Sequence, residues 1–156
     1  RMIKAHPYEE VAYDLIPLAN SRPGIGLGRI GPLVQETSAA VYAGRFKEAL
    51  GTSALRMVGE AEATVKKVAV CGGSGASLIR EAARQGADLF VTGDVKYHEA
   101  QMAEELGLVL VDAGHFATGH IAVKGLVSSL NREAGERDIN IRLEEATGHA
   151  DPFKVV

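Results

Sequence analysis

The stretch from Lys67 to His120 repeats one pattern three times. Each repeat has an apolar run of strand length, then a glycine turn, then a helical segment. The turns are Gly72-Gly73, Gly93-Asp94 and Ala113-Gly114, and Gly72, Gly93 and Gly114 lie 21 residues apart by their numbers. Strand, turn and helix repeated in phase are typical of βαβ units on a parallel sheet, so we predict an α/β fold. The predicted strands are Lys67–Cys71, Leu89–Thr92 and Leu108–Val111.

Chemically active side chains follow the second of these strands. Asp94, Lys96 and His98 place a carboxylate, an ammonium and an imidazole within one turn. Open parallel sheets bind ligands at the carboxyl ends of their strands, and such a set can supply acid, base and electrostatic stabilisation. The alternative is that Asp94 merely caps a helix whose first turn is exposed. The three residues are candidate catalytic residues.

The third turn, from Asp112 to His120, contains candidate metal ligands. An imidazole beside a carboxylate, as in His115 and Asp112, suits a divalent ion such as zinc, manganese or iron. A closed zinc site needs about four ligands, and His120 lies five residues from His115, away from its face of a helix. From spacing alone, metal binding is a hypothesis.

The first turn, Gly72 to Ser77, can be read in two ways. Its backbone amides can hold an anion at a helix N-terminus, or its glycines can serve only a tight turn. No Gly-Lys-Ser/Thr follows, and Leu78 occupies the place of the third glycine in a dinucleotide fingerprint. We expect Ser74 to cap the following helix.

Composition excludes several classes of protein. A net charge of −3 and a pI near 6.0 provide no basic surface for nucleic acid, which is not expected as a partner. No run approaches the roughly 20 apolar residues of a membrane span. The single cysteine, Cys71, cannot form an internal disulfide, so we expect a cytoplasmic protein. The chain opens on Arg1, and we expect it to be a piece of a longer polypeptide.

The segments that flank the repeat predict further elements. Residues 1–60 indicate strand, strand, helix and strand, which is most of a ferredoxin-like α+β unit, and Glu60–Thr64 is the expected linker to residues 61–156. After the repeat, we expect a helix that buries one apolar face, and then a half-exposed strand. The predicted elements of the first part are Val11–Pro17, Gly26–Leu33, Ser38–Gly51 and Ala54–Val58; those of the last part are a helical face of Val123, Leu126, Val127 and Leu130 and a strand at Ile139–Leu143.

Four motifs occur in a fixed order along the chain, and an Asp151-Pro152-Phe153 ending follows them. They are His6–Asp14, Lys66–Gly75, Gly93–His98 and Asp112–Thr118. Together they resemble the Nif-three-like family, many bacterial members of which are called GTP cyclohydrolase 1 type 2 homologues. The resemblance covers nearly the whole chain.

The resemblance implies a metalloprotein with two α/β halves and, in longer bacterial members, a PII-like or CutA-like ferredoxin-type insert. Residues 1–60 would be the later part of that insert, and residues 61–156 the second half. The family is similar throughout in holding two divalent metal ions between its halves and in forming hexamers. We therefore expect a part of a metal-dependent hydrolase that acts on a phosphorylated or nucleotide-like small molecule.

The family pattern also implies which residues bind metal. His115 matches a histidine ligand, whereas Gly119 stands where the family has a ligating glutamate four residues later. The remaining ligands, two histidines and an aspartate, belong to the first half. We expect an incomplete metal site in this chain, with Asp94, Lys96 and His98 handling protons or substrate anions. The alternative is an oligomerising regulatory or small-ligand-binding module with a vestigial site.

Overall fold

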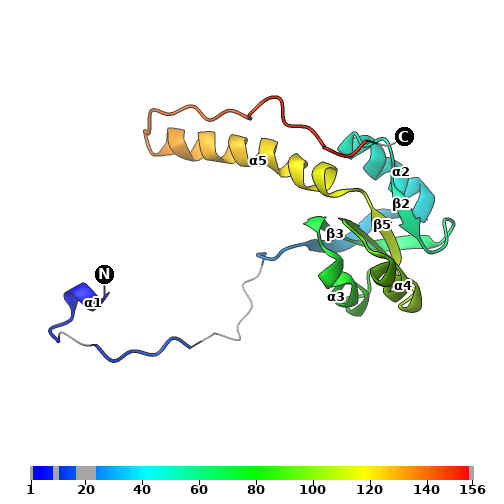
Figure 1. The fold of residues 1–156 in the computed structure, drawn as a ribbon, viewed down its shortest axis with the longest axis horizontal. Coiled ribbons are helices and arrows are strands. Elements are labelled where there is room, and N and C mark those ends of the chain that lie inside the picture. The colour runs from blue at the N-terminus through cyan, green and yellow to red at the C-terminus, as the bar shows by residue number, and fades with distance from the viewer. Residues whose placement is uncertain (1, 9–10, 17–23, 155–156) are drawn as a thin grey trace.

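The protein has a mixed α/β fold (Figure 1). Its described strands form a five-stranded sheet in the order β1-β3-β4-β5-β2. The computed structural model describes residues 2–8, 11–16 and 24–154. The central strands β3, β4 and β5 are parallel, as predicted, and the edge strands β1 and β2 are antiparallel to their neighbours. The strands are β1 Arg29–Ser38, β2 Arg56–Val58, β3 Thr64–Ser74, β4 Leu89–Gly93 and β5 Val109–Asp112.

The helices begin and end largely where the sequence provides caps. Ser38 Oγ accepts a hydrogen bond from the amide of Val41 at the start of α2, and Gly51 ends that helix in the left-handed conformation, as predicted. The predicted cap by Ser74 is wrong, because Ser74 still belongs to β3 and Gly75 precedes the next helical turn without a side-chain cap. The helical elements are α1 Met2–Ala5, α2 Ala39–Leu50, the 3-10 turn Ala76–Leu78, α3 Ile79–Arg84, α4 Tyr97–Glu105 and α5 His115–Glu136.

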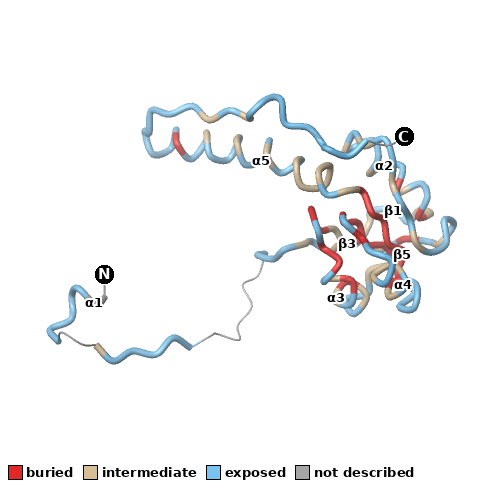
Figure 2. Tube along the Cα trace, in the orientation of Figure 1, coloured by how far each residue is buried: buried red, intermediate tan, exposed pale blue. Residues whose placement is uncertain are grey.

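The core lies on both faces of the sheet. Successive side chains of a strand point to opposite faces, so Leu89 packs on the side of α2 while Phe90 packs on the side of α3 and α4. The buried residues of the structure follow the central strands (Figure 2). Three layers, with helices above and below the sheet, therefore fix the carboxyl ends of β3, β4 and β5 relative to one another.

The ferredoxin-like unit predicted over residues 1–60 is not confirmed. Strands β1 and β2 join opposite edges of the same sheet as the repeat, β1 beside β3 and β2 beside β5. The sheet thus runs across the linker predicted at Glu60–Thr64. The physical reason is that both edges of the parallel core need a partner strand, and β1 and β2 supply them.

Two predicted strands are wrong. Residues Val11–Ile16 are irregular and mostly exposed, and Pro17, the expected end of that strand, lies outside the described residues. Ile139–Leu143 is also irregular, with Ile139 and Ile141 exposed. In the part of the chain that the structure describes, this segment lies along α5 and not beside an edge strand, since both backbone groups of Leu143 bond to the Asn131 side chain.

Helix α5 leaves the sheet and is flanked by the C-terminal segment (Figure 1). Its first turns touch β3, β4 and α2. The predicted burial of its apolar face is wrong for Leu126 and Leu130, which are exposed. Within the described residues, no helix combines the length and apolar character needed to cross a membrane.

Candidate functional site

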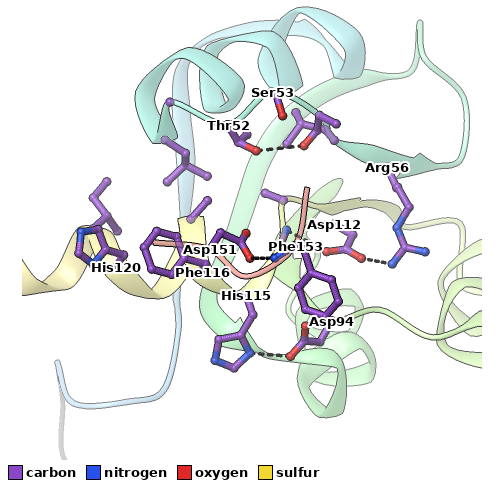
Figure 3. A pocket seen from close by; sticks show the side chains of 18 of the residues that line it. Thr52, Ser53, Arg56, Asp94, Asp112, His115, Phe116, His120, Asp151 and Phe153 are labelled. Carbon is purple, nitrogen blue, oxygen red and sulfur yellow. Dashed lines mark hydrogen bonds and ion pairs between the residues drawn. The ribbon is translucent and has the colours of Figure 1, made fainter. Parts of the chain in front are cut away.

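The turns after β4 and β5 bring Asp94 and His115 together. Asp94 Oδ2 lies 2.5 Å from His115 Nδ1, and both side chains are partly exposed. The two residues follow Gly93 and Gly114, so each is the first residue beyond the glycine of its repeat. Parallel neighbouring strands with turns of matching length therefore place these two side chains side by side (Figure 3).

Asp94 adopts a backbone conformation that few side chains favour. Its φ is 58°, in the left-handed region, which aspartate tolerates better than most residues. A network centred on Asp112 surrounds this turn. Asp112 Oδ2 accepts hydrogen bonds from the Val95 amide at 3.2 Å and from Arg56, and Arg56 Nη2 donates to the Val95 carbonyl at 2.9 Å. The turn is thus held at two backbone groups.

Asp112 is a buried carboxylate whose oxygens are both engaged. Its exposed fraction is 8%, and Oδ1 accepts a hydrogen bond from the Gly114 amide at 3.0 Å. The structure pairs Asp112 with Arg56 rather than with His115, and it pairs His115 with Asp94. The expected Asp112 and His115 metal pair is therefore not what these side chains form.

The first turn of α5 packs tightly against the ends of β3 and β4. Thr118 Oγ1 accepts a hydrogen bond from the Gly73 amide at 2.9 Å and donates to the Gly114 carbonyl at 2.7 Å. A Cβ on Gly93 would lie 2.7 Å from the Gly114 carbonyl, so no larger residue fits there without movement of the backbone. Close approach, rather than phosphate binding, explains this glycine.

The buried hydroxyl of Thr92 joins the ends of β3 and β4. Thr92 Oγ1 accepts a hydrogen bond from the Gly75 amide at 2.9 Å and donates to the Gly73 carbonyl at 3.1 Å. Both groups belong to the glycine-rich segment that the sequence offered as an anion loop. Because the Gly75 amide is already bonded within the protein, the segment matches a structural turn.

Within the described residues, no hydrogen bond or ion pair joins His98 or Lys96 to the Asp94 and His115 pair. Both are exposed on the first turn of α4, where His98 Nδ1 is 3.1 Å from Gln101 Oε1. The Lys96 amide donates to Glu99 Oε2 at 2.7 Å, which caps the helix. The structure therefore pairs Asp94 with His115, while the described hydrogen bonds of His98 and of the Lys96 amide stay within the first turn of α4.

A large open pocket adjoins the pair. Its volume is about 1320 Å³, and α2, α5, the turns after β4 and β5, and the C-terminal segment form its walls (Figure 3). Phe153, which is 86% exposed, contributes from the C-terminal segment. The polar and charged residues on its walls include Thr52, Ser53, Arg56, Asp94, His115, Lys124, Asp151 and Lys154. Both signs of charge occur, so the pocket is not uniformly anion-attracting.

The described residues supply one candidate metal ligand rather than a whole metal site. No group of three or more histidine, cysteine, aspartate or glutamate side chains lies close enough together in the part of the chain that the structure describes. His115 Nε2 makes no hydrogen bond within those residues, and its ring is about 3.4 Å from where a Cβ on Gly73 would stand. A carboxylate on one ring nitrogen with the other left open is the usual state of a ligating histidine.

The residues beyond His115 on α5 do not complete such a site. Gly119 offers no ligand, although nothing lies within 4 Å of a Cβ built there. His120 Nε2 lies 3.0 Å from Glu145 Oε1, and its ring stacks on Phe116. His120 therefore fastens the C-terminal segment to α5 rather than joining His115.

Sequence reasoning found the residues of the pair but not their pairing. It placed Asp94 with His98 and His115 with Asp112, which are neighbours in sequence. The available signal was the repeat itself, because Asp94 and His115 are 21 residues apart, the spacing of the glycine turns. Arg56 was missed, since a lone arginine on a short edge strand carries no sequence pattern.

Fold and site together define a class: an α/β protein with a carboxylate-held histidine at the carboxyl ends of parallel strands. Comparison with known proteins sharpens this class. Residues 2–152 match the model of the family described as Duf34/NIF3 (NGG1p interacting factor 3). The chain therefore belongs to the Duf34/NIF3 family, which confirms the resemblance found in the sequence.

Individual relatives agree with this assignment. A Bacillus subtilis protein named GTP cyclohydrolase 1 type 2 homolog is 41% identical over 152 residues, which are 97% of this chain and 40% of the relative. A solved structure of a Bacillus cereus protein related to NIF3 has a TM-score of 0.82 at 41% identity, and the match covers 99% of this chain and 42% of that one. Reduced HcgD from Methanocaldococcus jannaschii has a TM-score of 0.59 at 33% identity, over 69% of this chain and 43% of HcgD. The chain thus spans about two fifths of the length of the relatives it matches.

Proposed function

We propose that this chain supplies one wall of a divalent-metal-dependent hydrolase site, with His115 as a ligand through Nε2. The observation that carries the proposal is the 2.5 Å contact between Asp94 Oδ2 and His115 Nδ1 at the carboxyl ends of β4 and β5. That contact holds the imidazole by one nitrogen and leaves the other available. A bound metal ion such as zinc, manganese or iron would make hydroxide from water near neutral pH.

Each of this chain's own residues has a defined part in that proposal. Asp94 orients His115 and keeps the proton on Nδ1. The neighbouring pocket accepts a phosphorylated or nucleotide-like molecule, for which Arg56 and Lys124 offer cationic groups and Phe153 an aromatic face. His98 and Lys96 take part in proton transfer or anion binding only with a substrate that extends over the first turn of α4. The remaining ligands, and a hexameric assembly, come from outside these 156 residues.

The second candidate is an oligomerising regulatory or small-ligand-binding module. Gly119 favours it, because a residue without a side chain stands one helical turn beyond His115, where a ligand could reach the same ion. The position can be tested by substitution, since nothing lies within 4 Å of a Cβ built there.

The test uses the full-length gene product that contains this chain. Metal content is measured by mass spectrometry, and hydrolysis is measured on GTP and other phosphorylated compounds. His115→Ala should lower metal content and abolish turnover, whereas Gly119→Glu should raise metal affinity. Ser129→Ala, on the far part of α5, is the matched control. A metal-free protein without turnover would contradict the hydrolase and favour the module.

A further inference from the structure

We infer that Arg56 and Asp112 are positioning residues that set the tautomer and direction of the His115 imidazole by holding the turn that carries Asp94. The inference rests on the proposed function for the role of His115, and it extends that function to two residues outside the pair. Within the described residues, neither Arg56 nor Asp112 forms a hydrogen bond with His115. Their effect must therefore pass through the backbone of the turns.

Asp112 connects the turn after β4 with the turn after β5. The carboxylate of Asp112 accepts the Val95 amide on one oxygen and the Gly114 amide on the other. Val95 directly follows Asp94, and Gly114 directly precedes His115. One buried side chain thus sets the separation between the two backbone segments from which the paired side chains project.

Arg56 bonds both to Asp112 and to the backbone of the turn that carries Asp94. Its Nη2 donates both to Asp112 Oδ2 and to the Val95 carbonyl. Asp112 therefore binds the amide of Val95, and Arg56 binds the carbonyl of the same residue. The guanidinium also neutralises Asp112, which is 8% exposed and would otherwise be a costly buried charge.

This hydrogen-bond network supports a strained backbone at Asp94. Asp94 has a φ of 58°, and a residue other than glycine keeps such a conformation only where its surroundings fix it. A relaxed turn would move the Asp94 carboxylate away from His115 Nδ1. The neutral imidazole would then exchange its proton between the two nitrogens, and Nε2 would lose its role as the open acceptor.

The tautomer of His115 can be measured directly on the full chain, by nitrogen NMR of its histidine rings without metal or substrate. Only the neutral form of the ring is compared, at alkaline pH. In the unaltered protein Nδ1 should carry the proton. Arg56→Met and Asp112→Asn should each lower the ratio of Nδ1-protonated to Nε2-protonated His115 about fivefold, the equivalent of losing one hydrogen bond.

Arg84→Met is the matched control, because it removes an exposed arginine that pairs with Glu81 on α3, away from the turns. It should leave the ratio unchanged. If Asp112→Asn fails to fold, Arg56→Met decides alone, since Arg56 is 73% exposed on an edge strand. An unchanged ratio in folded Arg56→Met, or an equal change in Arg84→Met, would overturn the inference. A protein without hydrolase activity leaves this readout intact, so the two proposals fail separately.

Discussion

The sheet core and helix α5 hold their apolar residues in different ways. In the core, strands β3 to β5 are covered on both faces, and Phe90 is only 1% exposed. Along α5, Leu126 is 59% exposed, and the main tether in the far half is the hydrogen bonding of Asn131 to Leu143 in the C-terminal segment. The core is stabilised by extensive burial, whereas the far part of α5 buries Ala134 and is joined to the C-terminal segment by polar contacts.

This difference shows which part of the molecule fixes the positions of the site residues. Asp94 and His115 stand where the rigid core ends and α5 begins, so their backbone belongs to the well-packed part of the molecule. Packed interiors allow only small shifts of atoms without loss of stability. Changes in the core should therefore alter both stability and the site, while changes on the exposed far part of α5 should leave the site unaltered and shift stability by less.

The strongest test of this contrast removes a large side chain from each region. Phe90→Ala should lower the free energy of unfolding by about 3–5 kcal/mol, because it leaves a cavity between the sheet and α3. Leu126→Ala should change it by no more than about 0.5 kcal/mol. Urea unfolding followed by circular dichroism gives both values. Equal losses would show that α5 is as well packed as the core.

A second test adds a methyl group in each region. Gly93→Ala should cost about 1–3 kcal/mol, because the new Cβ would meet the Gly114 backbone at 2.7 Å. Gly125→Ala, in the interior of α5 with nothing within 4 Å, should stabilise by about 0.5–1 kcal/mol. Thermal unfolding compares the two variants. A neutral Gly93→Ala would mean that the turns can move apart freely.

A third test concerns the tether of the C-terminal segment. The Asn131 side chain donates to the Leu143 carbonyl at 2.8 Å and accepts from its amide at 2.9 Å. Asn131→Ala should speed hydrogen exchange at the Leu143 amide about tenfold while global unfolding changes little. Asn140→Ala, an exposed neighbour, is the control. Unchanged exchange at Leu143 would show that other contacts fix the segment.

The smallest expected effect is electrostatic and lies on the surface of α3. Hydrogen bonds from Arg84 and then Gln85 lower the pKa of Glu81 from 4.5 to about 2. Because the pKa in the folded state is below that of the unfolded chain, the stabilisation is present above about pH 4.5 and is lost as the pH falls toward 2. Glu81→Gln should flatten the acid side of the melting-temperature profile slightly. Identical profiles from pH 2 to 5 would contradict this.

The sequence predicted the parts of the fold that depend on local signals. The three parallel strands and the caps of α2 follow from apolar runs and from glycine and serine positions. The missing strand at Ile139–Leu143 depends on something non-local, namely whether the segment comes to lie beside a sheet edge or along α5. The same holds for β1 and β2, because their pairing depends on which edge of the parallel core each one reaches.

The candidate site shows the same division between local and non-local information. Asp94 and His115 were identified from their places after glycine turns, yet their partners were not. Hydrogen bonding between residues 21 positions apart depends on strand register, which no single turn reveals. Arg56 joins the network from an antiparallel edge strand, and its role became visible only when β2 was placed beside β5.

Gly73, Asp94 and His115 are one position of the repeat taken three times, each 21 residues after the last. The first copy contributes an empty space beside the imidazole, the second an acid and the third a base. The contact therefore depends on the number of residues between Asp94 and His115. One inserted residue can leave every strand in place and still separate the two side chains. The lengths of the helices between the strands thus determine whether the two side chains of the site meet.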